Sequence, residues 1–324
     1  MRDEVIPVFF TVDNSYVPYL DCAVRSMIQN ASKDYSYRII VLYENVPEEN
    51  LNKLRKSVKE PFQIQFVEMK EKVEGLSDRV ENRLRCDYFT MTIYFRLFIA
   101  DMFPEFEKAV YIDSDVIVPG DISKMYHLEL VGNLIGACPD HSVADIPELA
   151  RYMEKTIGVD KHEYINSGVL LMNLKKMREV EFSKRFLYLL NQYHFDCIAP
   201  DQDYLNAMCK GNILFLDECW DAMPPEGARR EPLENPELIH YNLFQKPWCY
   251  DDIPYAKYFW KYAKDSPFYS EILANKENYS EKQKKSDREC LDVLIRKAGV
   301  LDQGPVTFCK VQKNGEQIKY DNWR

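Results

Sequence analysis

Glycine is scarce in this chain, with 11 glycines among 324 residues. Neither a GxGxxG fingerprint nor a Walker P-loop occurs in the sequence. Both motifs hold phosphate groups with the backbone N–H groups of a glycine-rich loop. A phosphate site cradled by glycines is therefore excluded.

Positive charge is also in short supply. Lys and Arg number 42 against 52 Asp and Glu, which gives a formal net charge of −10. Binding to nucleic acid needs a basic surface, so nucleic acid is not expected as a partner. A small anionic ligand remains compatible with this balance, because a bound divalent cation can supply positive charge locally.

The sequence lacks the marks of secretion and of membrane insertion. The nine cysteines form no CxxC pair and are odd in number, which favours reduced thiols over a disulfide framework. No run approaches the roughly 18 continuous apolar residues of a membrane span. The N-terminal residues carry charges and then a short apolar run, unlike a secretory signal. We expect a soluble, cytoplasmic protein without a transmembrane segment.

Strand and helix signals alternate along most of the chain. Strands are expected at 6–12, 37–43, 62–69, 108–112, 134–138, 164–174, 213–217 and 237–241. Helices are expected around 20–28, from 47 onward, and at 90–102, 146–156, 175–193 and 201–209. This alternation predicts βαβ units and an α/β fold with a mainly parallel sheet.

The tail after about residue 265 has a different pattern. A charged helix is expected at 281–297, ending at Gly299. The pair Asn314-Gly315 predicts a type I′ hairpin. We therefore divide the chain into a main domain at 1–265 and a C-terminal appendage of helix and hairpin at 266–324.

The most informative feature is Asp113-x-Asp115, directly after the apolar run 109–112. Open α/β sheets bind ligands beyond the carboxyl ends of their strands. Two carboxylates one residue apart can face a common point there and hold a hard cation that bridges phosphate oxygens. The alternatives are a loop that merely exposes two acids, or an Asp that caps a helix.

Six segments, taken together, resemble the retaining glycosyltransferases of family 8, which include bacterial lipopolysaccharide galactosyl- and glucosyltransferases and glycogenin. They follow the family's order and lie within roughly 5–250. The segments are VFFTVDNSYVPYL (8–20), YFRL (94–97), YIDSDVIVPGDI (111–122), YINSGVLLMNLKKMR (164–178), PDQDYLNAM (200–208) and IHYNLFQKPW (239–248).

The resemblance implies a fold, an activity and partners. The fold is a single Rossmann-like, nucleotide-sugar-binding domain of the GT-A type at 1–265. The activity is transfer of glucose or galactose from a UDP-sugar to a glycan or glycolipid acceptor, with Mn²⁺ as cofactor and Mg²⁺ as the alternative. A peripheral position at the inner membrane face is a further expectation for a cytoplasmic enzyme of this kind.

The same resemblance assigns the metal to Asp113, Asp115 and His240. His240 ends the apolar run 236–239, so it is expected at the carboxyl end of a strand as well. A site of carboxylates and imidazole suits Mn²⁺ better than the oxygen-preferring Mg²⁺. Taken alone, His240 reads as an ordinary core or surface histidine.

Four residues after the first strand are expected to receive the nucleoside: Thr11, Val12, Asp13 and Tyr16. In the family an acid binds the uracil and an aromatic ring stacks on it, which are the places of Asp13 and Tyr16. The alternatives are a turn aspartate and an interface tyrosine. Relatives often carry Asp-Asn before the tyrosine, where this chain has Asn-Ser.

The resemblance further implies that Lys246 binds the diphosphate, that Arg96 touches the donor sugar and phosphate, and that Ser114 belongs to the donor-binding residues. An ammonium group at Lys246 would stabilise the charge that develops on the departing nucleoside diphosphate. The alternatives are a solvated surface lysine and a structural ion pair at Arg96. Many relatives carry glycine three residues after the histidine, where this chain has Leu243.

By the same resemblance the donor-sugar pocket would be lined by Asn166, Asp201 and Gln202, and the catalytic residues would be Asp201, Gln202 and Lys246. Asp201 follows Pro200, so it would also serve as a helix cap. Gln202 stands where an amide would face the sugar. An amide is a very poor nucleophile, so attack on the same face is favoured over a double displacement.

Two other functions remain open from the sequence. Phosphatases of the haloacid-dehalogenase type also carry a DxD motif, but theirs normally ends the first strand, whereas three strand signals precede Asp113 here. The other alternative is a protein that binds a nucleotide sugar without turning it over.

Overall fold

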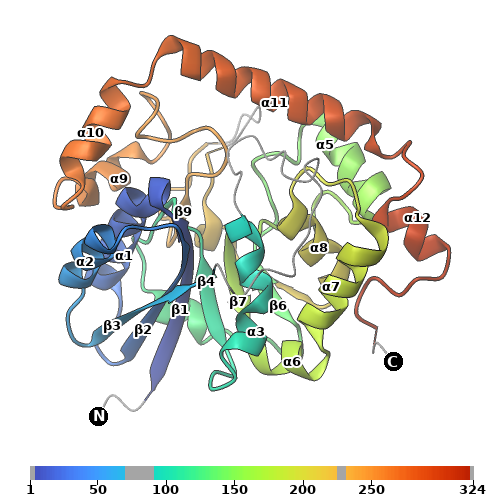
Figure 1. Cartoon of the computed structure of the whole chain (residues 1–324), viewed down its shortest axis with the longest axis horizontal. Helices are drawn as coiled ribbons and strands as arrows, with labels where there is room; N and C mark the ends of the chain where they lie inside the picture. Colours follow the sequence, from blue (N-terminus) through green and yellow to red (C-terminus); the bar gives the residue numbers. More distant parts are fainter. Residues whose placement is uncertain (1–3, 70–90, 225–230, 322–324) are drawn as a thin grey trace.

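The computed structural model describes residues 4–69, 91–224 and 231–321 (Figure 1). Its strands are β1 Val5–Asp13, β2 Ser36–Glu44, β3 Phe62–Glu68, β4 Ala109–Ile112, β5 Val116–Ile117, β6 Ile135–Ala137, β7 Val169–Met172, β8 Ile213–Phe215 and β9 Ile239–His240. Its α-helices are α1 Val17–Asn30, α2 Glu48–Ser57, α3 Ile99–Met102, α4 Ile122–Tyr126, α5 Pro147–Tyr152, α6 Leu174–Glu179, α7 Phe182–Tyr193, α8 Pro200–Cys209, α9 Ala256–Ala263, α10 Tyr269–Glu277, α11 Glu281–Leu301 and α12 Phe308–Lys313. Short 3-10 helices lie at η1 Asn14–Tyr16, η3 Met91–Phe98 and η5 Glu218–Asp221, and η4 Met153–Ile157 is a π-helix.

In the described residues the strands form a seven-stranded sheet in the order β3-β2-β1-β4-β7-β6-β8, and β5 pairs with β9 in a small second sheet. Within the large sheet β7 alone runs antiparallel to its neighbours β4 and β6. The carboxyl ends of the other strands therefore meet at one edge. The amino end of β7 lies at that same edge, so residues just before Val169 join those that follow β1, β4 and β6.

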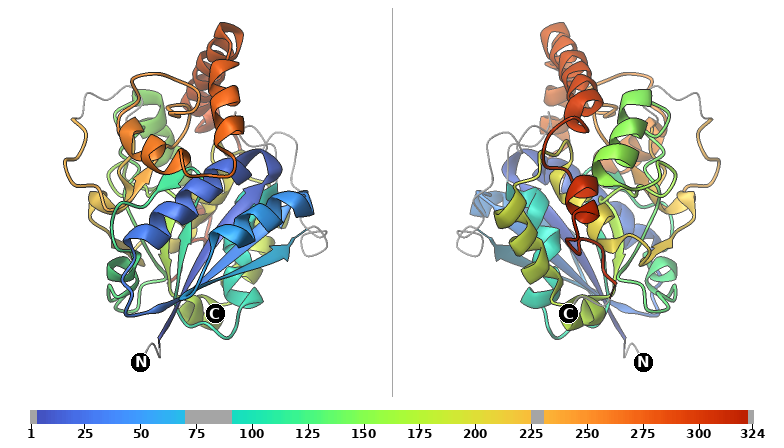
Figure 2. Two further views of the ribbon diagram at one scale, coloured as in Figure 1. Left: turned by 90° about the vertical axis from the view of Figure 1, so that its left-hand side faces the viewer. Right: turned by 90° about the vertical axis from the view of Figure 1, so that its right-hand side faces the viewer.

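The sheet is covered on both faces, which explains why its strands are apolar throughout. Along β1 the side chain of Phe9 enters one apolar core, while those of Val8 and Phe10 enter the other. Helices α1, α2, α9 and α10 belong to the second core, and α5, α7, α8 and α12 to the first. The two side views show the strands between these layers (Figure 2). The expected α/β fold with a mainly parallel sheet is confirmed.

Several predicted boundaries differ from the structure. The strand predicted at 164–174 is interrupted: Ile165 forms an isolated antiparallel bridge with Pro139, and β7 begins only at Val169. Between them the N–H groups of Ser167 and Gly168 donate to the side chains of Gln202 and Asn166. The helix predicted at 175–193 is two helices, since Glu181 between them has a left-handed φ of 51°. Of the helix predicted at 90–102, the described part is η3 followed by α3.

The prediction that the charged C-terminal helix ends at Gly299 is wrong. Helix α11 opens with a capping box between Ser280 and Gln283 and continues through Gly299 to Leu301. A Cβ atom at Gly299 would lie 3.3 Å from Cγ of Glu148 in α5. The glycine therefore allows α11 to pack closely on α5 and does not end the helix.

The predicted hairpin at Asn314-Gly315 is also wrong. These residues end the short helix α12, whose first turn is capped by the Thr307 side chain. A type I′ turn needs a positive φ at both central residues. Asn314 has φ −83° and Gly315 has φ +100°, so the glycine follows the helix as a left-handed terminator. The division of the chain at residue 265 stays a prediction.

Helix α11 lies beyond the carboxyl-end edge of the sheet, on the side opposite the N-terminus (Figures 1 and 2). Of the helices in the described ranges, none is both long and apolar enough to cross a membrane.

Candidate functional site

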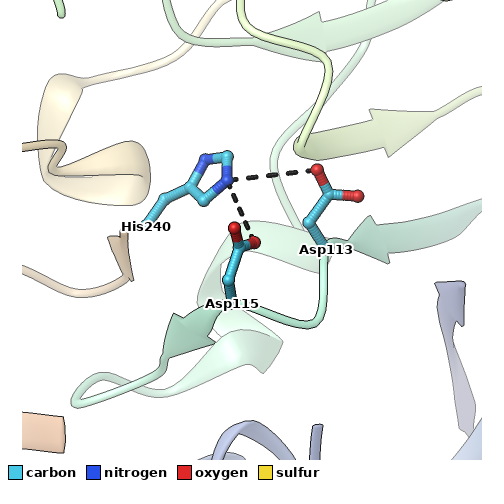
Figure 3. Close-up of side chains that lie close together, drawn as sticks. All are labelled: Asp113, Asp115 and His240. Atoms are coloured by element: carbon cyan, nitrogen blue, oxygen red, sulfur yellow. Dashed lines mark ion pairs between the residues drawn. The ribbon is translucent and has the colours of Figure 1, made fainter. Parts of the chain in front are cut away.

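Three side chains that could ligate a metal converge at the carboxyl-end edge of the sheet. Asp113 follows β4, Asp115 precedes β5, and His240 is brought in by β9, where it pairs with Val116 of β5. One ligand atom from each side chain lies within 4.8 Å of the others (Figure 3). His240 Nε2 is 3.3 Å from Asp115 Oδ1 and 3.9 Å from Asp113 Oδ2.

A fourth residue, Asp221, orients the histidine. Its Oδ1 atom is 3.1 Å from His240 Nδ1, which leaves Nε2 facing the two aspartates. Burial lowers the pKa of His240, but the carboxylates of Asp115 and Asp221 outweigh burial and raise it to about 10. A ligating histidine commonly bonds a carboxylate through its other nitrogen. Sequence reasoning missed Asp221, which lies 19 residues from its partner and in no recognisable motif.

The three side chains fit a divalent cation. Asp115 Oδ1 is buried, lies 3.3 Å from His240 Nε2 and has no hydrogen-bond partner among the described residues, so a cation placed between the two side chains would engage it. Gly168 keeps the space between the ligands open: a Cβ there would lie 2.3 Å from His240 Cε1 and 2.7 Å from Asp113 Oδ2. Two carboxylates and an imidazole are a donor set for Mn²⁺ or a similar ion.

Lys246 lies beside this group and is buried. Its Nζ is 2.6 Å from Asp115 Oδ2 and 2.7 Å from the carbonyl oxygen of Tyr241. Burial alone would raise the pKa of Asp115, but Lys246 and His240 outweigh burial and hold that pKa well below its usual value. The Nζ atom also lies 5.8 Å from the ring centre of Tyr16. Lys246 is thus not the solvated surface lysine of the alternative interpretation.

Arg96 links the candidate metal ligands to the predicted sugar pocket. Its Nη2 is 2.9 Å from Asp113 Oδ1, and its Nε is 3.2 Å from Asp201 Oδ2. It also donates to the backbone and side-chain oxygens of Ser167 and lies over the ring of Tyr111. Arg96 is therefore part of a buried ion-pair network, which was the alternative role considered for it. That network includes Asp113 and so belongs to the site.

The residues predicted to receive the nucleoside line the adjoining end of β1. Thr11 Oγ1 is 2.7 Å from the hydroxyl of Tyr111, which in turn donates to Asp113, and Ser114 Oγ donates to the Thr11 carbonyl. The Val12 side chain is buried in the core, which leaves its backbone as the part that can meet a ligand. Asp13 Oδ1 accepts from Ser15 and caps η1, the turn role named as its alternative.

Gln202 and Asn166 lie on another side of the site, joined by Asp140. Both amide NH₂ groups donate to Asp140 Oδ2, each over 3.1 Å, and Gln202 Oε1 accepts from Ser167 N. Sequence reasoning missed Asp140. The signal was present, because Asp140 follows the strand predicted at 134–138, where the same edge rule that selected Asp113 applies.

The two aspartates that flank Gln202 have different surroundings. Asp201 does not cap its helix, because α8 has no side-chain cap. Its Oδ2 instead meets Arg96 and Ser167, while its buried Oδ1 has no hydrogen-bond partner in the part of the chain that the structure describes. Asp203 accepts hydroxyl donors from Tyr152 and Tyr164, and burial raises its pKa to about 6. Asp203 is thus held among tyrosines by both of its oxygens.

Known proteins are similar to this chain in sequence and in fold. Lipopolysaccharide 1,2-glucosyltransferase of Escherichia coli (strain K12) is 27% identical over 199 residues, which are 54% of this chain and 57% of that protein. The structure of the bifunctional glycosyltransferase WbbM has a TM-score of 0.71 at 23% identity, over 85% of this chain and 52% of WbbM. The structure of galactosyltransferase LgtC with donor and acceptor sugar analogues has a TM-score of 0.64 at 24% identity, over 87% of this chain and 100% of LgtC.

These likenesses show that the fold is of the GT-A type. The chain spans less than two thirds of several relatives, including 65% of a Haemophilus influenzae protein that is 27% identical to it over 224 residues. A model of one family, described as glycosyl transferase family 8, matches residues 7–252. Because that match covers most of the length of this chain, the chain belongs to glycosyltransferase family 8.

Proposed function

We propose that this chain is a retaining glycosyltransferase that moves glucose or galactose from a UDP-sugar to a hydroxyl group of a glycan or glycolipid. The proposal rests on the convergence of Asp113, Asp115 and His240 at the ligand edge of a GT-A sheet. Relatives named for glucosyl transfer to lipopolysaccharide and for galactosyl transfer support a hexose donor.

Asp113, Asp115 and His240 would hold the cofactor, with Asp221 fixing the histidine ring. The imidazole favours Mn²⁺, with Mg²⁺ as the alternative. When bound, the ion supplies positive charge, which offsets the negative charge of the diphosphate and the further negative charge that develops as the diphosphate leaves. Lys246 would turn from Asp115 to the diphosphate and stabilise the same developing charge from the other side.

The remaining predicted residues would orient the donor. Asp13 and Tyr16 would receive the uracil, and the Thr11 hydroxyl, the Val12 backbone and Ser114 would border the ribose. Arg96 would meet the sugar and diphosphate end, because it already lies between Asp113 and Asp201.

In the proposed chemistry the acceptor hydroxyl attacks the anomeric carbon on the face that the diphosphate leaves. The bond from that carbon to the diphosphate oxygen breaks, and the acceptor's proton passes to an oxygen of the departing diphosphate. Gln202 would support the cation-like sugar with its amide oxygen, and Asn166 and Asp201 would border the ring. Asp203 is a poor nucleophile here, because Tyr152 and Tyr164 occupy both of its oxygens.

Two alternatives differ in what they predict. The phosphatase interpretation is dropped, because the chain belongs to another family and Asp113 follows β4 and not the first strand. A binding protein without turnover would keep the donor site and release no sugar.

We further propose that the protein works in the cytoplasm or at the inner membrane face, with 266–324 as an appendage to the catalytic domain at 1–265.

The test is calorimetry of UDP with and without Mn²⁺, followed by incubation with labelled UDP-glucose and UDP-galactose. We expect UDP and Mn²⁺ to bind together and much more weakly apart, because the aspartates repel a diphosphate unless a cation intervenes. Equal UDP affinity in chelator would contradict the metal site. Tight binding without release or transfer of sugar would favour the binding protein.

A further inference from the structure

Lys246 begins a short turn, residues 246–250, which we call the lysine turn. The carbonyl oxygen of Lys246 accepts a hydrogen bond from Tyr250 N over 3.0 Å, which closes a single helical turn. Trp248, inside this turn, is buried and stacks on Tyr19 of α1, with the ring centres 3.9 Å apart. One side of the lysine turn is therefore fixed against α1.

The lysine turn is also held by Lys276 of α10. The Nζ atom of Lys276 donates to the carbonyl oxygen of Pro247 over 3.3 Å and to that of Tyr250 over 3.2 Å. It also pairs with Asp251 Oδ1 over 2.8 Å and lies 5.3 Å from the ring centre of Trp260 in α9. The last carbonyl oxygens of a helical turn have no partner within the turn, and a lysine side chain can satisfy them. Lys276 thus takes the place that further helix would have.

Helix α11 supplies a second anchor for the same turn. The hydroxyl group of Tyr250 donates to Asp287 Oδ2, and the hydroxyl group of Tyr279 donates to the same oxygen over 2.7 Å. Lys276 and Asp287 both lie after residue 252, where the match to the family model ends. The anchors on this side therefore come from 266–324, the predicted appendage.

A fixed backbone matters here because the side chain of Lys246 is proposed to change its partner. In the structure its Nζ atom is 2.6 Å from Asp115 Oδ2. Once that atom turns to the diphosphate, its position depends on the backbone from which the side chain extends. Lysine has a flexible four-carbon stem, and any freedom left in the backbone would add to the entropy that binding costs. Anchors on the lysine turn confine this cost to the side-chain torsions of Lys246.

We propose that Lys276 is a positioning residue for donor binding: by holding the lysine turn, it fixes the backbone from which Lys246 reaches the diphosphate. This inference rests on the proposed function, because it takes Lys246 to bind the diphosphate of the donor. Lys276 acts through Lys246 and not by contact with the donor. The segment 266–324 thereby has a part in the donor site.

The test is a double-mutant cycle between Lys276 and Lys246. Lys276→Met removes the ammonium group and keeps an unbranched side chain, and it is made both in the natural protein and in Lys246→Met. Lys276→Arg keeps the charge and the donor groups. Asp251→Asn removes the charge of the carboxylate partner, whose side chain is 80% exposed, and leaves the bonds from Lys276 to the lysine turn. Calorimetry of UDP in Mn²⁺ is the measurement, and denaturant titration checks that each variant is folded.

In the natural background we expect Lys276→Met to lower UDP affinity about three- to tenfold, the effect of one lost hydrogen-bonded anchor. In Lys246→Met the same substitution should change UDP affinity less than about twofold, because the side chain that Lys276 positions is no longer charged. Lys276→Arg should keep UDP affinity within about twofold, since it retains the donor groups. Asp251→Asn should do the same, because an exposed ion pair contributes little.

A merely structural role for Lys276 gives a different result. An equal loss of UDP affinity in both backgrounds would show that Lys276 acts on the site as a whole, and it would overturn the proposal. Unchanged UDP affinity in Lys276→Met would overturn it as well. If Lys276→Met does not fold, Lys276→Gln takes its place in the cycle, because its side chain is also neutral and keeps one donor group.

Failure of the proposed function is separable from failure of this inference. If the natural protein does not bind UDP with Mn²⁺, or if Lys246→Met binds UDP as tightly as the natural protein, the proposed donor site is wrong and this proposal falls with it. If Lys246→Met weakens UDP binding and Lys276→Met does not, the proposed function stands and Lys276 has no positioning role.

Discussion

Lys246 Nζ lies 2.6 Å from Asp115 Oδ2, so the lysine proposed to bind the diphosphate and an aspartate proposed to hold the metal form one buried ion pair. The pair leaves Asp115 Oδ1 directed to the side of His240, 3.3 Å from its Nε2. In this arrangement one carboxylate connects the two positive charges that a nucleoside diphosphate needs. When a donor binds, the ammonium group of Lys246 would exchange its carboxylate partner for a phosphate. The buried ammonium group would therefore keep an anionic partner throughout.

The first prediction concerns Lys246→Met, which keeps an unbranched side chain one atom shorter and removes the charge. Affinity for UDP in Mn²⁺ should fall about 10- to 100-fold, since a hydrogen bond to a charged group contributes about 1.5–3 kcal/mol. Calorimetry measures this directly. Lys264→Met, at an exposed lysine, is the matched control. Unchanged UDP affinity in Lys246→Met would remove the lysine from the diphosphate site.

The second prediction concerns Asp115→Asn. Turnover should be lost, because one charged ligand disappears and the metal is held less tightly. The free energy of unfolding should also fall by about 3 kcal/mol, because Lys246 is left buried without its partner. Denaturant titration and rate measurements check both effects, and Asp145→Asn, at an exposed acid, should change neither. A near-normal rate for Asp115→Asn at low Mn²⁺ would show that the metal site is wrong.

The third prediction concerns Gly168→Ala. The added Cβ would meet His240 Cε1 at 2.3 Å and Asp113 Oδ2 at 2.7 Å, so the two ligands must move apart. We expect Mn²⁺ affinity in the presence of UDP to fall at least tenfold, a loss that calorimetry resolves. Gly299→Ala makes the same chemical change inside α11 and should leave Mn²⁺ affinity as it is. Equal Mn²⁺ affinity in all three proteins would contradict the role given to Asp113 and His240.

The fourth prediction is that transfer keeps the α configuration of the donor, without a long-lived covalent intermediate. Gln202→Ala should slow transfer without abolishing it, since the charge stabilisation by Lys246 remains. Proton NMR of the first product reads the anomeric outcome. A β-linked first product would overturn the stereochemistry. A glycosylated Asp201 or Asp203, trapped with a slow donor and found by mass spectrometry, would overturn same-face attack.

The fifth prediction follows from the raised pKa of Asp203. Its pKa is about 6 in the folded protein against an ordinary 3.8, because burial disfavours the charged form. Between these values the folded state binds more protons than the unfolded state, so this contribution to stability is full below 3.8 and is lost as the pH rises through 6. The free energy of unfolding should therefore lose about 1 kcal/mol from this group between pH 5 and 7.5.

Asp203→Asn isolates that contribution, because asparagine is neutral throughout the range. The stability difference between the natural protein and Asp203→Asn should shrink by the same amount as the pH rises, whatever hydrogen bonds to Tyr152 and Tyr164 the variant loses. Urea titrations at several pH values measure the difference. A difference that does not vary with pH would show that Asp203 has an ordinary pKa.

The chain's local patterns were enough to predict the fold class and to select Asp113 and Asp115 as candidate metal ligands. Strands with apolar residues on both faces could only be buried in an α/β sheet, and the position of Asp113 and Asp115 after such a strand placed them at its ligand edge. The resemblance of 239–248 to family 8 supplied His240, which spacing alone left ambiguous.

Local patterns failed where one feature suits two structures. An Asn-Gly pair is compatible with a hairpin or with a helix end. Here it ends α12, whose residue Phe308 stacks on the distant Phe195. Gly299 reads as a helix stop, whereas the approach of Glu148 makes it a packing position.

Only the tertiary structure decided which polar side chains pair with one another. The pairing of Lys246 with Asp115, of Asp221 with His240, and of Gln202 with Asp140 joins residues between 19 and 131 positions apart. Such contacts depend on the strand order and on the antiparallel course of β7, which no local periodicity encodes. The sequence by itself determined the alternation of strands and helices and the carboxylates that follow β4. The packing of those elements determined which groups are buried together, and burial and proximity set their pKa values and their partners.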